Sequence, residues 1–249
     1  MIWGLSMTYE TTIPGEDFFP FITSITDFVG DAKVIFEDYI VVSTVDTANV
    51  VLINSAVRNP NPPPEPIEVI LDIRSIRGLT TSKNDVTIRI NGNNGIELKT
   101  GRMEYRLPSI MEPGLKHIKM PNKEFPVKLM VSGSALFDGI TGMIASNKAI
   151  EESLGFWFIV ENEETFYLQD KLKMYSKAVF TPTEEFTIDY YETPAASMFS
   201  IDYLEDMAKH LKVFDNVKVC LTNNDPMVMV AMNETRKLAY AIACRMPDV

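Results

Sequence analysis

Most of the chain consists of short segments in which apolar residues are either continuous or alternate with polar ones. Both patterns are typical of β-strands. They occur at residues 33–36, 40–45, 86–90, 155–160, 217–221 and 227–232. We therefore expect a protein rich in β structure.

Two segments have clear helical periodicity. The first follows Asp17, a good N-cap residue type, and places on one face Phe18, Phe21, Ile22, Ile25 and Phe28. The other follows Ser200 and spans residues 201–211, where one face carries Leu204, Met207, Ala208 and Leu211. These segments predict amphipathic helices that cover a sheet.

Two further segments have a weaker helical pattern. Asp72 can cap a short helix through Ile73 and Ile76, with Arg74 and Arg77 pointing away from that apolar pair. Residues 134–145 predict the other helix, although the two glycines inside it lower helix propensity. The sequence therefore predicts four helices.

The predicted helices begin near residues 17, 72, 134 and 200, and strands separate them, which suggests a duplicated unit. Between the halves lie Pro113, Gly114 and Pro121, which favour an extended connector. We predict an α+β protein with an N-terminal domain at residues 1–108, a connector at 109–124 and a C-terminal domain at 125–249.

Composition places the chain among ordered globular proteins, because 46% of its 249 residues are hydrophobic and 23% are charged. Cys220 and Cys244 lie in apolar stretches without metal-ligand spacing, so we expect buried thiols in a reducing compartment, and no metal or cofactor. No segment has the length of a spanning helix or the pattern of a signal peptide. We expect an intracellular protein with no membrane partner.

The sequence has none of the common catalytic signatures. It lacks a glycine-rich phosphate loop, a metalloprotease helix motif and a nucleophile elbow, and residues 91–95 predict a hairpin turn. With only His117 and His210, acid–base catalysis would depend on carboxylates. We predict that the protein is not an enzyme, although motifs alone leave a carboxylate–metal nuclease open.

Five motifs follow one another in an order that resembles the proliferating cell nuclear antigen family of DNA sliding clamps, especially the archaeal type. They are residues 7–19 (MTYETTIPGEDFF), 45–52 (VDTANVVL), 197–209 (SMFSIDYLEDMAK), 224–227 (NDPM) and 238–245 (LAYAIACR). The resemblance covers nearly the whole chain, and it suggests that residues 1–6 are an extension or an alternative start.

The resemblance implies a ring of three subunits that encircles double-stranded DNA without reading its sequence. In such a ring, residues 102–110 of one subunit pair with residues 171–180 of the next. The corresponding interface residues here are Arg102, Tyr105, Leu107, Lys173, Tyr175 and Lys177. Closing sheets across subunits would also remove exposed strand edges.

A clamp needs basic side chains that touch phosphates and leave the bases alone, since a base-specific contact would stop it from sliding. The family's inner positions match Arg74, Arg77, Lys83, Lys148, Lys209, His210 and Lys212. The alternative is that these are ordinary solvated charges, with Glu205 and Lys209 forming an i,i+4 pair. Such a basic stripe would reconcile DNA binding with the net charge of −11.

The resemblance also implies a hydrophobic pocket for client peptides. Its clients would be DNA polymerase, clamp loader, ligase and nuclease, which dock through an aromatic and aliphatic plug. The matching positions are Val45, Ala48, Val50, Leu52, Ile118, Met120, Pro121, Pro226, Tyr240, Ala243 and Cys244.

Two departures from the family pattern affect this interpretation. The first helix has no Lys or Arg, and Cys244 replaces a proline common at the pocket rim. A polymerase processivity factor is the function implied, and a specialised or regulatory subunit of a heterotrimer is the alternative. Either would be cytoplasmic and nucleoid-associated in an archaeon, or nuclear in a eukaryote.

Overall fold

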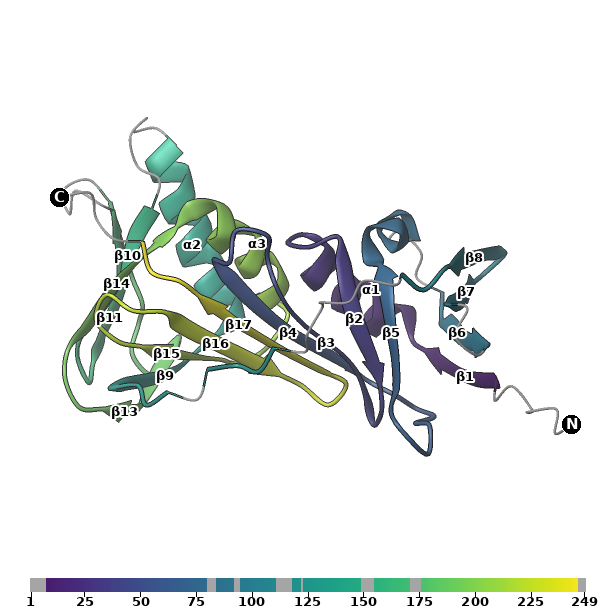
Figure 1. Cartoon of the computed structure of the whole chain (residues 1–249). Helices are drawn as coiled ribbons and strands as arrows, with labels where there is room; N and C mark the ends of the chain where they lie inside the picture. The colour runs from purple at the N-terminus through teal and green to yellow at the C-terminus, as the bar shows by residue number, and fades with distance from the viewer. Residues whose placement is uncertain are drawn as a thin grey trace, which may run out of the picture. The chain divides into compact units, whose positions relative to one another are not determined.

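A computed structural model describes residues 8–79, 84–91, 95–110, 118–121, 123–148, 155–170 and 176–245. These residues form two compact units (Figure 1). The first comprises Met1–Lys119 with Glu234–Lys237, and the second comprises Met120–Asn233 with Leu238–Val249. The division after Lys119 falls inside the stretch predicted as a connector, and the predicted domain limits stay a prediction.

The first unit begins with strand β1 (Thr8–Ile13) and helix α1 (Gly15–Thr26). Four strands follow: β2 (Asp31–Phe36), β3 (Tyr39–Val45), β4 (Val51–Arg58) and β5 (Ile67–Asp72). A 3₁₀ helix η1 (Ile73–Leu79) then leads to β6 (Val86–Asn91), β7 (Ile96–Thr100) and β8 (Met103–Leu107). The strands lie in the orders β1-β6-β7-β8 and β4-β3-β2-β5.

The second unit repeats this sequence of elements. It begins with β9 (Val127–Val131) and α2 (Gly133–Lys148). Next come β10 (Gly155–Asn162), β11 (Thr165–Asp170), β12 (Lys177–Val179), β13 (Phe186–Tyr191) and β14 (Ala195–Ser200). Helix α3 (Ile201–Leu211) precedes β15 (Val217–Leu221), β16 (Met227–Met232) and β17 (Arg236–Ile242).

The strand orders of the second unit, β12-β11-β10-β14 and β13-β9-β15-β16-β17, match those of the first apart from the added β13. In both units the first strand lies beside a later three-strand meander. This shared topology, together with the matching element order, supports the duplication that the helix spacing suggested. All the described strand-to-strand registers are antiparallel.

Each unit buries its helices against its own strands. The apolar face of α1, which includes Phe18, Phe21, Ile22 and Ile25, is buried and packs on β4 and η1. In the second unit α2 packs on α3, β11 and β12. Gly133 and Gly139 make this packing possible, because a β-carbon at Gly133 would lie 2.3 Å from the Phe214 carbonyl oxygen and one at Gly139 would lie 2.7 Å from the Phe180 ring.

The predicted strands and three of the predicted helices are confirmed, but the second helix is a 3₁₀ helix rather than an α-helix. Its Asp72 still satisfies the first turn, because the carboxylate accepts hydrogen bonds from the Arg74 amide at 3.1 Å and the Ser75 hydroxyl at 2.8 Å. The expected capping role of Asp17 is wrong. Helix α1 begins at Gly15, so Asp17 lies within the first turn.

Candidate functional site

The 3₁₀ helix of the first unit presents two of the predicted phosphate-binding residues. Ile73 and Ile76 are buried, whereas Arg74 and Arg77 are exposed, as the spacing predicted. The Arg74 side chain passes over Gly30, where a β-carbon would lie 3.0 Å from the guanidinium group. Arg77 is paired with Asp27 at the end of α1, with 2.7 Å between Nη2 and Oδ1.

Helix α3 of the second unit presents three more of the predicted residues near its C-terminus, where a helix dipole favours positive charge. Lys209 Nζ lies 2.9 Å from Asp206 and 3.8 Å from Glu205, so the i,i+4 pair expected from the sequence is present. Lys212 Nζ lies 4.8 Å from the centre of the Phe137 ring. His210 is half-buried.

Acidic side chains are as prominent as basic ones on the described helices and their ends. They are Glu16, Asp17, Asp27, Asp138, Asp202, Glu205 and Asp206. Helix α1 itself contains no Lys or Arg. Because Arg77 and Lys209 already contact carboxylates, a phosphate group would compete with those carboxylates for the same cations.

Several predicted residues cannot be placed. Lys83, Lys173 and Tyr175 lie outside the described residues, and only the backbone of Lys148 is described.

The turn between β3 and β4 is built around one buried carboxylate. Asp46 Oδ1 accepts hydrogen bonds from the amides of Val50 and Val51, both at 2.7 Å, and Oδ2 accepts one from the Ala48 amide at 3.1 Å. Asn49 adopts a positive φ of 57°, which such a tight turn requires. The turn therefore presents Ala48 and Val50 in a fixed conformation, with Ala48 exposed and Val50 half-buried.

A half-exposed apolar surface continues from this turn along β3 and β4. Val45 and Leu52 lie opposite each other in the β3–β4 register, and both are half-buried. The Ser43 hydroxyl donates a hydrogen bond to the carbonyl oxygen of Ile118, which ties the predicted connector to β3. Val45, Ala48, Val50, Leu52 and Ile118, all predicted pocket residues, thus belong to one surface of the first unit.

The other predicted pocket residues belong to the second unit. Met120, Pro226, Ala243 and Cys244 are half-buried and Pro121 is exposed, whereas Tyr240 is fully buried. Contacts that hold the Pro226 loop include an ion pair between Lys123 and Asp225 and a hydrogen bond of 3.2 Å from the Asp225 amide to Ser197 Oγ. Tyr240 is a core residue in this unit and cannot serve as a surface probe of the pocket.

Other parts of the chain cover three of the sheet edges. Asn61 Nδ2 donates to the Glu10 carbonyl on β1 at 2.7 Å, and the Ile110 amide donates to the Ile70 carbonyl on β5 at 2.9 Å. On β14, the Met198 carbonyl accepts a hydrogen bond of 2.7 Å from the Arg245 amide.

Strands β8 and β12 lie at the ends of their sheets, and in the described part of the chain no further strand pairs with either of them. Both carry a large exposed apolar side chain. Met103 on β8 is 52% exposed and Val179 on β12 is 63% exposed. The family resemblance predicted these strands as an interface, but the sequence analysis did not name Met103 or Val179. The signal that could have identified them is an apolar residue in a strand at the edge of a sheet.

Beside this edge, burial and a 2.5 Å hydrogen bond to Glu161 raise the pKa of Tyr167 to about 12. The neutral Tyr167 ring lies 3.4 Å from Lys177 Nζ, measured to the ring centre, so the lysine is held by a cation–π contact. Elsewhere, burial lowers the pKa of Arg236, and the nearby Asp17 carboxylate opposes that shift.

Within the described ranges, no group of three or more His, Cys, Asp and Glu side chains is placed to hold a metal ion. None of the helices found there is long and apolar enough to cross a membrane.

Comparison with known proteins gives consistent results. No family model matches the chain. A DNA polymerase sliding clamp of Methanocella arvoryzae is 25% identical over 230 residues, which cover 88% of this chain and 90% of that protein.

Among solved structures, Archaeoglobus fulgidus PCNA bound to the C-terminal region of FEN-1 has a TM-score of 0.81 at 21% identity, covering 98% of this chain and 100% of the other. The PCNA2–PCNA3 complex of Sulfolobus tokodaii gives a TM-score of 0.78 at 18% identity, with 95% and 99% coverage. These findings confirm the resemblance drawn from the sequence and the expected clamp fold.

Proposed function

Because this chain has the sliding-clamp fold and is similar along most of its length to archaeal DNA polymerase sliding clamps, we propose that it is one subunit of a ring that encircles duplex DNA. The ring holds polymerase on its template and recruits other replication and repair proteins. It catalyses no reaction itself. We infer that the protein is associated with chromosomal DNA.

The observation that carries this proposal is that β8 and β12, each the last strand of a four-stranded sheet, carry large exposed apolar side chains. Long exposed edges invite uncontrolled strand pairing, and proteins normally cover them, charge them or close them into a ring. Hydrogen bonds from other residues of the chain reach the edges of β1, β5 and β14, whereas β8 and β12 expose Met103 and Val179, and the third remaining end strand, β13, exposes Tyr190. Pairing β8 of one subunit with β12 of the next satisfies the unpaired backbone groups of both edges and covers part of both side chains, and three such joints close a ring.

The proposed DNA contacts are sequence-independent. Seven side chains would reach the phosphates: Arg74, Arg77, Lys83, Lys148, Lys209, His210 and Lys212. Support comes from the exposure of Arg74, Arg77, Lys209 and Lys212 in the structure. The ion pairs of Arg77 and Lys209 make the expected contact weaker than a simple count of cations suggests.

Client proteins dock on the apolar surface that includes Val45, Leu52 and Ile118. The Asp46 turn supports this assignment, because a prearranged surface loses little conformational freedom when a peptide binds. Archaeoglobus fulgidus PCNA, which has the same fold, is known in complex with the C-terminal region of FEN-1, and this supports a docking site for partner segments.

The ring is tested by the solution mass of edge variants. Met103→Lys and Val179→Lys each place a charge in the proposed joint, so we expect either variant to convert a trimer into monomers in mass photometry. Met232→Lys is the matched control, since Met232 is 63% exposed and lies on β16, which is part of neither edge strand. If all three variants keep the mass of the unsubstituted protein, β8 and β12 do not form the joint.

A second candidate, a specialised subunit of a ring of different chains, is favoured by the charge of α1. That helix has no basic residue, and Asp27 at its end neutralises Arg77. In such a ring other subunits would supply the missing positive charge. Purified chain that stays monomeric until a second clamp chain is added would establish this candidate in place of the first.

A further inference from the structure

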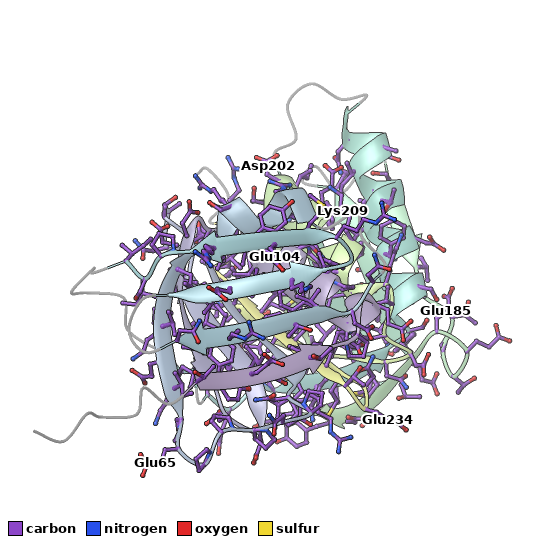
Figure 2. All side chains as sticks on the ribbon, turned by 90° about the vertical axis from the view of Figure 1, so that its right-hand side faces the viewer. Glu65, Glu104, Glu185, Asp202, Lys209 and Glu234 are labelled. Atoms are coloured by element: carbon purple, nitrogen blue, oxygen red, sulfur yellow. The ribbon has the colours of Figure 1, made fainter. Side chains whose placement is uncertain are left out.

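Strand β8 presents two different faces at the proposed joint. Glu104 lies opposite Lys99 and Arg106 lies opposite Glu97 in the β7–β8 register, and all four are exposed or half-buried. The other face carries Met103, Tyr105 and Leu107, opposite Thr100, Leu98 and Ile96, which are all buried. In Figure 2 Glu104 lies on the face of this sheet that is turned to the viewer. The charged residues of β8 therefore lie on the outer face, away from the core.

Strand β12 has the same division. Ala178 lies opposite the buried Leu168 and faces the core, where α2 packs on β12. Lys177 and Val179, opposite Gln169 and Tyr167, point to the other face and are both exposed. Side chains alternate along a strand, so any joint between β8 and β12 must keep these two outer faces together.

Because of this alternation, the possible registers of the joint differ from one another by two residues. The charges that each register brings together then show which one is favoured. In one register Glu104 lies opposite Lys177. Shifting β8 by two residues in one direction places Arg106 opposite Lys177. Shifting it by two residues in the other direction places Arg102 opposite Lys177, if the alternation of β8 extends to that residue. Opposite charges directly across a joint stabilise it and like charges destabilise it. Only the first of these three registers brings an attractive pair together.

We propose that β8 of one copy of this chain pairs antiparallel with β12 of the next copy in the register that places Glu104 opposite Lys177. This inference rests on the proposed ring. Antiparallel pairing continues the arrangement of every described strand pair. It also places Met103 opposite Ala178 on the inner face, so that a large apolar side chain meets a small one.

The existing contacts of both residues are compatible with this pairing. Glu104 Oε1 lies 3.2 Å from Lys99 Nζ, and its second carboxylate oxygen can accept a further hydrogen bond. Lys177 Nζ lies over the Tyr167 ring, and an ammonium group has three hydrogens to donate. The neighbouring Arg106 is compensated by Glu97, at 3.1 Å, which weakens its repulsion of Lys177.

Cysteine cross-linking of the full chain tests the register. Residues directly opposite in an antiparallel pair have β-carbons about 4.5–5.5 Å apart, whereas diagonal neighbours are about 7–8 Å apart. A disulfide needs roughly 3.5–4.5 Å between β-carbons, so only directly opposite positions come within easy reach. We expect the double variant Glu104→Cys with Lys177→Cys to form intersubunit disulfides on mild oxidation and to give a covalent trimer on denaturing gels.

The control double variant Arg106→Cys with Lys177→Cys is expected to remain uncross-linked. Strand direction is tested by a third double variant, Arg102→Cys with Val179→Cys, which cross-links only if the strands are antiparallel. Efficient cross-linking of the Arg106 control, or failure of the third pair beside a cross-linked first pair, would overturn the proposed register. Unsubstituted chain that is monomeric by mass photometry would instead refute the self-assembled ring.

Charge reversal provides an independent readout. Glu104→Lys places two lysines opposite each other, and we expect the trimer to dissociate at a concentration about tenfold higher, in line with the cross-strand pair energies of sheets. Combining it with Lys177→Glu restores an opposite pair and should return the dissociation to near its original value. A double variant as weak as the single one would contradict direct contact between these residues.

Discussion

At the residue scale, the clearest functional feature is a carboxylate that fixes a turn. Asp46 is only 5% exposed, and three backbone amides donate to it. Hydrogen bonds to a charged group are stronger than neutral ones, and removing one partner leaves buried donors unsatisfied. Asp46 thus links a motif that is visible in the sequence to the shape of the proposed client surface.

We predict that Asp46→Asn lowers the free energy of unfolding by about 2 kcal/mol, because a neutral amide replaces the charged acceptor. Affinity for a peptide with an aliphatic and an aromatic anchor should fall at the same time, since Ala48 and Val50 lose their fixed positions. Chemical denaturation and fluorescence anisotropy measure the two effects. Asp31→Asn, at an exposed position on β2, is the matched control.

If Asp46→Asn weakens folding but leaves peptide affinity unchanged, the turn is structural and does not shape the client surface.

Pairings over long sequence distances limited what the sequence could show at this scale. The Asp17 carboxylate accepts a 2.7 Å hydrogen bond from the Thr235 hydroxyl, a residue 218 positions away. The contact between Asp27 and Arg77 joins residues 50 positions apart. Local patterns predict which residue types can cap a helix or bind a phosphate, but they carry no information about which distant partner a charge will meet.

At the element scale, prediction succeeded where hydrophobic periodicity was strong. Helix α3 has the predicted limits, 201–211, because its buried residues follow a regular helical spacing. The second helix was misassigned because Ile73 and Ile76, three residues apart, fit a 3₁₀ helix as well as an α-helix. For α2, the glycines at positions 139 and 142 weakened the helix prediction, whereas the structure shows that Gly139 allows close packing against Phe180.

The charges on the helices and at their ends also determine how strongly the protein can bind DNA. Asp27, the residue that follows α1, forms an ion pair with Arg77, so we predict that Asp27→Asn removes a carboxylate that competes with phosphate for this cation. The slope of log affinity against log salt concentration should then steepen by about one for each phosphate gained. Fluorescence anisotropy with a duplex at several salt concentrations measures this slope.

The control for this experiment is Glu68→Gln, which also removes one negative charge from the first unit, at a carboxylate 2.5 Å from Lys33 Nζ. An equal change of slope in both variants would show that only net charge matters, and it would contradict a specific role for Arg77.

At the scale of the whole molecule, the proposed function depends on whether the subunits close into a ring around DNA. The sequence predicted two duplicated units, and the repeated strand orders agree with that prediction. It also predicted which strands meet between subunits, but this came from the family resemblance; the structure adds exposed Met103 and Val179 as a physical reason. A protein with a net charge of −11 gains little from electrostatic attraction to DNA, so a closed ring is the more effective means of retention.

The most direct measurement is therefore whether the protein stays on linear DNA while both ends are blocked and leaves when the DNA is cut. Linear duplex fixed to a bead at one end is incubated with the protein, the free end is blocked with a bulky group, and the beads are washed at about 1 M salt, which screens ionic contacts beyond roughly 3 Å. We predict that protein remains bound through the wash and is released when a restriction enzyme cuts the duplex. Protein that the wash removes from blocked DNA, or that stays bound after the cut, would contradict a ring that encircles DNA.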